Sequence, residues 1–331
     1  MTSSPPPRPT PGKSRREFLG TLASGLGVSA AGLAAAPRAS ARPLATTWNL
    51  RAVQTSYDFA DGTALPFFRF APSGGGGRRG QLPYFEATEG DAVDVIIDNQ
   101  LPIALRPALI GVAEGPEIAA GTSGVFSFTM PPAGSYLFGH APPRFSSRSH
   151  GPVAHPTHSG LSASVTSRPT SGQQELYNGG PTFDREYGLI YEDADSRINQ
   201  TMGGTTPSRT KPYEPNYFTV NGLAFPDSAS DPDTIVSGSL GEDILIRFGN
   251  FGRMRQSIHF HGYHAQIVAQ NTVPDATMPP KDTIAVPYHT TVDVILTPNQ
   301  AGVYPLHPHS LTAVTANGFY PLGALALIDI T

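Results

Sequence analysis

The chain has 331 residues, a formal net charge of −4 and only 15% charged residues, together with 35 glycines and 34 prolines. Glycine and proline interrupt helices, so this composition favours many short strands and turns. The small negative net charge does not indicate a nucleic-acid partner. The sequence contains no cysteine, which excludes disulfides, zinc–thiolate sites, iron–sulfur clusters, a cysteine nucleophile and a blue-copper site, because blue copper needs a thiolate ligand.

The first 41 residues have the layout of an export signal. Arg15 and Arg16 precede a weakly apolar, Ala/Gly-rich run from Thr21 to Ala36, and Ala39 to Ala41 forms an A-x-A cleavage site. Paired arginines before a modest apolar run are typical of twin-arginine signals. The run is too short and too glycine-rich for a stable membrane-spanning helix. We therefore expect residues 1–41 to engage the twin-arginine machinery, and the cleaved chain to be periplasmic or secreted and free of the membrane.

Residues 42–195 are expected to form a first all-β domain. Alternating apolar and polar residues recur in short segments bounded by turn residues, which is the spacing of a Greek-key sandwich. The predicted strands include segments within 47–70, 85–99, 125–130, 134–138 and 185–191.

A polar stretch from Pro142 to Gly180 interrupts this first domain. It contains His150, His155 and His158, which either form a second metal site in a loop or are simply exposed. Residues 196–215 are expected to be a linker.

Residues 216–331 are expected to form a second sandwich of the same plan. Glu89 to Asp91 precedes a strand as Gly241 to Asp243 does, and Ala133 to Tyr136 matches Ala301 to Tyr304. These repeats indicate a tandem duplication. The predicted fold class is therefore all-β, with two tandem Greek-key β-sandwiches.

Two His-x-His pairs carry the clearest chemical signal, His259 with His261 and His307 with His309. Successive side chains of a strand point to opposite faces, so each pair puts both imidazoles on one face. Two such strands side by side bring four imidazoles together. Neutral imidazole suits copper, zinc, iron and nickel, so these four residues are the predicted metal site.

The layout resembles the multicopper oxidases, which are built from cupredoxin domains, over nearly all of the mature chain. The stretches that carry the resemblance are residues 89–101, 134–138, 184–187, 217–227, 259–262 and 307–309. The resemblance implies two cupredoxin-like sandwiches. It also places both His-x-His pairs where the family has ligands of its type 2 and type 3 coppers.

The other copper ligands of the family are replaced in this chain. A full member has four His-x-His pairs around a three-copper cluster, and a type 1 copper held by a cysteine and two histidines. The corresponding positions here are Ala108, Ile110, Gly139 and Ala141 in the first domain, and Gln256, Pro308 and Ala313 at the type 1 site. His140 stands one residue out of register. A laccase-type reaction is therefore not expected.

Three functions follow from the resemblance. The first is an exported copper-binding protein with a partial histidine site, zinc being the alternative metal, that acts in copper handling or has limited oxidoreductase activity. The second is a copper-free cupredoxin scaffold that works as a periplasmic interaction protein. The third is an oxidase whose missing ligands come from a different chain. Two-domain members often form homotrimers, but a homotrimer cannot restore ligands that this chain lacks.

Overall fold

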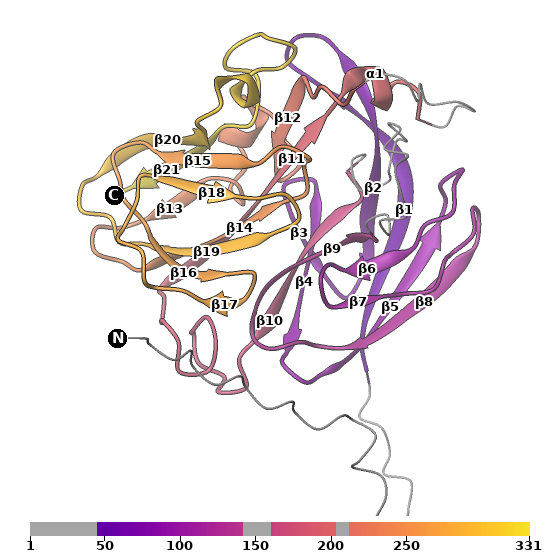
Figure 1. Ribbon diagram of the computed structural model, residues 1–331, viewed down its shortest axis with the longest axis horizontal. Coiled ribbons are helices and arrows are strands. Elements are labelled where there is room, and N and C mark those ends of the chain that lie inside the picture. Colours follow the sequence, from indigo (N-terminus) through magenta and orange to yellow (C-terminus); the bar gives the residue numbers. More distant parts are fainter. Residues whose placement is uncertain (1–44, 142–159, 203–211) are drawn as a thin grey trace, which may run out of the picture. The chain divides into compact units, whose positions relative to one another are not determined.

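The computed structural model describes residues 45–141, 160–202 and 212–331 (Figure 1). The predicted signal peptide at 1–41 and the histidines at 150, 155 and 158 lie outside the described residues. None of the helices in the described ranges is long and apolar enough to cross a membrane. The described part of Arg42–Thr331 forms one compact unit made of four β-sheets.

The first sandwich consists of a four-stranded sheet in the order β2-β1-β5-β8 and a six-stranded sheet in the order β3-β4-β10-β9-β6-β7. The core between them is rich in aromatic side chains, with Trp48 stacked on Phe85 at a ring separation of 4.8 Å. The strands are β1 (Thr46–Asp58), β2 (Ala64–Gly74), β3 (Gly77–Arg79), β4 (Leu82–Thr88), β5 (Ala92–Asn99), β6 (Pro107–Leu109), β7 (Ala113–Glu114), β8 (Ser123–Thr129), β9 (Gly134–His140) and β10 (Ser162–Arg168).

The second sandwich pairs a six-stranded sheet, β12-β11-β14-β19-β16-β17, with a five-stranded sheet, β13-β21-β20-β15-β18. The strands are β11 (Arg185–Ala194), β12 (Tyr217–Val220), β13 (Val236–Gly238), β14 (Ile244–Asn250), β15 (Gln256–Phe260), β16 (Gln266–Gln270), β17 (Val273–Pro274), β18 (Thr283–Val286), β19 (Thr291–Leu296), β20 (Gly302–Pro308) and β21 (Ala326–Ile330). The helices are one turn each: α1 (Ser196–Asn199), η2 (Asp227–Ala229) and η3 (Leu311–Val314). The all-β prediction is confirmed.

Both sandwiches contain the same hydrogen-bonding arrangement around a buried asparagine. Asn99 and Asn250 end the equivalent strands β5 and β14, and both side chains are fully buried. Asn99 Nδ2 donates to the carbonyls of Ile103 and Ile118 at 2.9 and 3.1 Å, and Asn250 Nδ2 donates to those of Met254 and Val286 at 2.8 and 2.9 Å. Buried backbone carbonyls need such donors. The two asparagines make matching hydrogen bonds, as expected of two halves that share one plan.

Strand β11 differs from the expected domain division. It lies within the range 42–195 that we assigned to the first domain, yet it pairs in parallel with β14 and antiparallel with β12 in the second sandwich. The linker expected at 196–215 begins with α1, and its residues 203–211 lie outside the described ranges. Sequence spacing did not reveal this because β11 has no hairpin partner before it in the chain.

Buried polar contacts join the two sandwiches. Arg69 of β2 pairs with Glu192 of β11 at 2.6 Å, and both side chains are less than a tenth exposed. Ser135 of β9 donates a 2.5 Å hydrogen bond to Asp293 of β19 and accepts one from Arg247 of β14. Because unpaired buried polar groups are costly, these contacts fix one arrangement of the two halves.

Candidate metal centre

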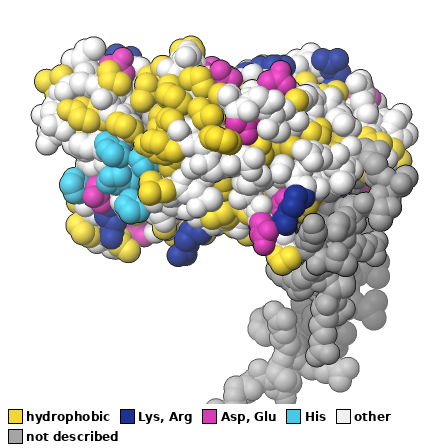
Figure 2. All heavy atoms as spheres, turned by 90° about the horizontal axis from the view of Figure 1, so that it is seen from above, with side chains coloured by type: hydrophobic (Ala, Val, Ile, Leu, Met, Phe, Trp, Pro, Cys, Tyr) yellow, Lys and Arg dark blue, Asp and Glu magenta, His cyan; other side chains and the backbone are white. Residues whose placement is uncertain are grey.

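The two histidine pairs lie on neighbouring strands. His259 of β15 stands directly opposite His307 of β20 in an antiparallel ladder, and His261 and His309 follow two residues further along each chain segment. Phe260, which stands between His259 and His261, is buried in the core of the second sandwich. Histidine side chains gather in one surface patch in Figure 2. The strand register therefore brings four imidazoles to one face.

The four rings are close neighbours. The ring centre of His259 lies 4.7 Å from that of His261, 6.1 Å from His307 and 5.5 Å from His309. His261 and His307 are 5.0 Å apart by ring centre, and their Nε2 atoms are 2.9 Å apart. His309 is exposed and the other three are partly buried. The closest donor pair is thus His261 with His307.

Backbone carbonyls orient two of the rings. His259 Nδ1 lies 3.0 Å from the carbonyl of Asp282 and 3.0 Å from Thr283 Oγ1, and His307 Nδ1 lies 2.9 Å from the carbonyl of Pro308. A carbonyl can only accept, so in the neutral rings the hydrogen sits on Nδ1 and Nε2 keeps its lone pair. Metal-ligating histidines are usually held in this way through the second nitrogen.

The surroundings favour the neutral imidazole. Burial lowers the pKa of His261, and the neighbouring charges of His307 and His259 lower it further. Burial also lowers the pKa of His307, where the hydrogen bond to the Pro308 carbonyl opposes part of the effect. The neutral ring is the form that binds metals, so near neutral pH these rings are in the charge state that a metal needs.

The donor set of the described residues is that of a partial site. As the side chains stand, the described ranges hold no group of three or more His, Cys, Asp or Glu placed around one ion. One pair of nitrogens is close enough to share an ion, and two further imidazoles adjoin it. In the metal-free state, His261 Nε2–H donates to the lone pair of His307 Nε2.

The equivalent place in the first sandwich has no room for such ligands. Ala108 of β6 stands opposite Gly139 of β9, as His259 stands opposite His307. Ala108 is 1% exposed, and a Cβ on Gly139 would lie 2.7 Å from the ring of Phe251. This half of the family's cluster is filled by packed side chains and does not fit a metal.

The family's type 1 position is also packed. Gln256, Pro308 and Ala313 are all buried, and Ala313 belongs to the hydrophobic core of the second sandwich. None of them offers a thiolate or an imidazole, so the site does not fit type 1 copper. His140, the histidine out of register, accepts a hydrogen bond at Nδ1 from the backbone N–H of Arg106 at 3.1 Å.

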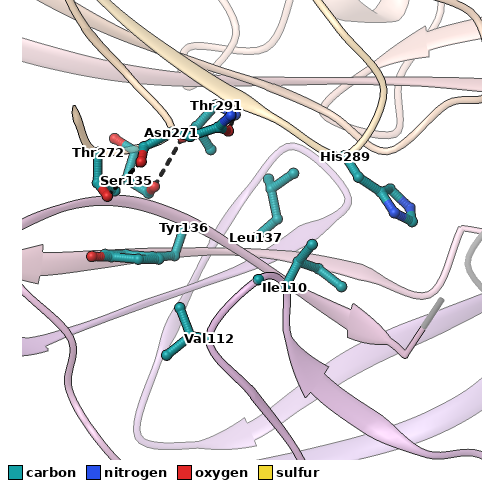
Figure 3. A pocket seen from close by; sticks show the side chains of 10 residues that line it. Ile110, Val112, Ser135, Tyr136, Leu137, Asn271, Thr272, His289 and Thr291 are labelled. Atoms are coloured by element: carbon teal, nitrogen blue, oxygen red, sulfur yellow. Dashed lines mark hydrogen bonds between the residues drawn. The ribbon is translucent and has the colours of Figure 1, made fainter. Parts of the chain in front are cut away.

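A well-formed cavity lies elsewhere. It measures about 310 Å³, and none of the four clustered histidines lines it. Figure 3 shows its apolar wall, with Ile110, Val112 and Leu137, facing the polar side chains of Asn271 and Thr272 among others. His289 also lines this cavity, whereas His264 is exposed. Sequence reasoning gave no sign of this cavity, because strands more than a hundred residues apart form its walls.

Comparisons with known proteins agree with this picture. Residues 199–320 match the family model described as multicopper oxidase. No curated protein matches the chain in sequence. Among solved structures, the multicopper oxidase mgLAC aligns over 86% of this chain and 86% of its own, with 20% identity and a TM-score of 0.68. The blue copper oxidase from Nitrosomonas europaea aligns over 86% and 85%, with 19% identity and a TM-score of 0.68.

A copper nitrite reductase from Nitrosomonas europaea aligns over 86% of this chain and 93% of its own, with 20% identity and a TM-score of 0.64. At such identities, structural likeness establishes the fold, and the family match covers the part of the chain that carries both histidine pairs. The fold is therefore that of two cupredoxin-like sandwiches, and the part of the chain that carries both intact His-x-His pairs is similar to the multicopper oxidases.

Proposed function

We propose that the chain is an exported copper-binding protein whose site consists of His259, His261, His307 and His309. The observation that carries the proposal is the 2.9 Å separation of the Nε2 atoms of His261 and His307. Nitrogen ligands that share one ion through bonds of about 2.0–2.1 Å lie roughly 3 Å apart. The two nitrogens therefore already stand at a separation that suits a common metal.

Copper is the metal that this donor set favours. Imidazole ligands suit copper, which binds most tightly among the divalent first-row metals, and zinc is the alternative in a tetrahedral arrangement. His261 and His307 would hold the ion, and His259 and the exposed His309 adjoin them. Bound copper would supply a one-electron couple at the protein surface.

Copper handling or limited oxidoreductase activity fits the site better than a laccase-type reaction. The chain has no cysteine for a type 1 copper, which is the family's entry point for electrons. Packed apolar residues also replace the first-sandwich ligands. Export by the twin-arginine route to the periplasm or the exterior, and assembly as a homotrimer, are proposed from the sequence and the resemblance.

A copper-free scaffold is the second candidate, and one observation favours it. The Nε2 atoms of His261 and His307 satisfy each other by a direct hydrogen bond, so the pair needs no metal to be stable. In this function the histidine patch would serve as a polar surface for a partner protein. The two candidates differ in whether the chain takes up copper.

Metal analysis separates them. Protein exported by its own signal and purified without chelator is analysed by mass spectrometry beside a His261→Ala/His307→Ala double variant and a His264→Ala control. The proposal expects close to one copper per chain in the wild type and the control, and little in the double variant. Equal copper in all three proteins, or none in the wild type after dialysis against Cu(II), would reject it and favour the scaffold.

A further inference from the structure

A second, smaller cavity has an unusual set of polar side chains. It measures about 100 Å³ and lies where β1, β2 and β3 of the first sandwich meet Gly222, in the turn after β12 of the second. Its lining includes two arginines, Arg69 and Arg78, and no carboxylate. Thr55 and Ser56 also line it. A lining with positive charge and hydrogen-bond donors suits an anion.

Arg69 has a donor that nothing in the described protein uses. The residue is only 6% exposed, and its Nη1 donates to Glu192 Oε2 at 2.6 Å and to the carbonyl of Gly160 at 3.3 Å. Its Nη2 is buried and has no hydrogen-bond partner among the described residues. Buried polar groups nearly always have a partner, so an orphaned guanidinium nitrogen at a cavity calls for an acceptor.

Gly222 keeps space free beside this nitrogen. A Cβ at Gly222 would lie 3.4 Å from Arg69 Nη2 and 2.9 Å from the Cβ of Gln81. Its φ of +74° is in the left-handed region that favours glycine. The backbone N–H of Gln81 donates to the carbonyl of Asn221 at 2.8 Å, which holds the turn against the first sandwich. The turn thus leaves open space, which we call the cradle, next to Nη2 of Arg69.

The residues that line the cavity carry positive charge and no negative charge. Glu192 pairs with Arg69 through Nη1 and neutralises that guanidinium, while Nη2 has no hydrogen-bond partner among the described residues. Tyr57, which also lines the cavity, donates its hydroxyl hydrogen to Asp227 at 2.8 Å; this carboxylate keeps its charge, but it is exposed to solvent and lies outside the lining. The exposed Arg78 adds a cation that no described carboxylate in the lining offsets. An incoming anion would therefore meet Arg78, whose charge no carboxylate of the lining offsets, and one unpartnered donor.

We propose that this cavity binds a small oxyanion of the phosphate class. Arg69 Nη2 donates to one oxygen, and Arg78 supplies the charge that makes binding favourable. Hydrogen bonds between guanidinium groups and anionic oxygens are among the strongest in proteins. The volume admits a few water molecules or one small oxyanion, and it is too small for a nucleotide. The site is independent of the histidine patch and of copper.

Calorimetric titration of the full chain with inorganic phosphate at neutral pH, with ionic strength held constant by sodium chloride, tests this proposal. The variants are Arg78→Gln and, as the matched control, Arg255→Gln, because Arg255 is exposed and lies outside the cavity lining. Loss of one charge-assisted contact should weaken phosphate binding about tenfold or more in Arg78→Gln and leave Arg255→Gln unchanged.

Two further arms complete the test. Gly222→Ala, checked for folding by circular dichroism, should lose phosphate binding because the methyl group fills the cradle. Titration with methyl phosphate tells free phosphate from the head group of a larger molecule: binding of both supports a head group, and binding of inorganic phosphate alone supports the free ion. No phosphate binding by the wild type, or equal weakening in Arg78→Gln and Arg255→Gln, would overturn the proposal.

Discussion

The free energy of unfolding of this protein should fall at low pH because of Glu186. Three arginines converge on its carboxylate: Arg247 at 3.0 Å, Arg79 at 3.8 Å and Arg168 in direct contact. Burial by itself raises the pKa of Glu186, but the hydrogen bond from Arg168 and the charges of Arg247, Arg168 and Arg79 outweigh it and lower the pKa from 4.5 to about 2. The charged form is therefore strongly favoured in the folded state.

The magnitude follows from the two pKa values. The pKa is lower in the folded chain, so stability is fully present above pH 4.5 and is lost as the pH falls towards 2. A pKa difference of about 2.5, at about 1.4 kcal/mol per pH unit, corresponds to about 3 kcal/mol for Glu186. The side chain is 16% exposed, so solvent screens little of this contribution.

The assay is urea unfolding of the wild type and Glu186→Gln at several values between pH 6 and pH 2.5. The variant should be less stable by about 3 kcal/mol at pH 6, and the difference should shrink as the pH approaches 2. Glu242→Gln is the control, because Glu242 pairs with Arg185 at 2.8 Å on the surface, where ion pairs contribute little. A constant gap between wild type and Glu186→Gln across this pH range would refute the reasoning.

Four other substitutions test the packing and the buried hydrogen bonds of the two sandwiches. Gly139→His should destabilise the chain by about 1–3 kcal/mol in chemical denaturation, because a Cβ there meets the ring of Phe251 at 2.7 Å; an unchanged midpoint would contradict this. Asn250→Ala removes a buried side chain that serves two backbone carbonyls and should cost about 2–3 kcal/mol, and Asn99→Ala should cost a similar amount in the first sandwich; thermal unfolding compares them, and a neutral result for either would argue against the shared hydrogen-bonding arrangement. Phe260→Ala should cost about 3–5 kcal/mol, because this ring is 1% exposed behind the histidine strand; a loss below about 1 kcal/mol in denaturant titration would show that the strand is not anchored by its core face.

Local sequence patterns predict much of the fold and the grouping of the histidines at the candidate site. A period of two predicts that His259 and His261 share a face, and repeated motifs predict two similar all-β halves. The assignment of β11 required more, because its partners β12 and β14 follow later in the chain and only three-dimensional pairing joins them.

Other parts of the site depend on strand register and could not be predicted. His259 Nδ1 meets Asp282 and Thr283 because β15 pairs with β18, and nothing in the intervening residues signals that contact. The small cavity is similar: Arg69 and Gly222 are far apart in the sequence, and the orphaned guanidinium nitrogen becomes visible only when both sandwiches are in place.

Electron paramagnetic resonance of the chain loaded with one Cu(II) ion tests the central claim most directly. Copper held by His261 and His307 should show hyperfine coupling to imidazole nitrogen, and the His261→Ala/His307→Ala double variant should lose that coupling while His264→Ala keeps it. A spectrum of hydrated Cu(II) in the wild type, or the same nitrogen coupling in the double variant, would contradict copper binding at the histidine patch.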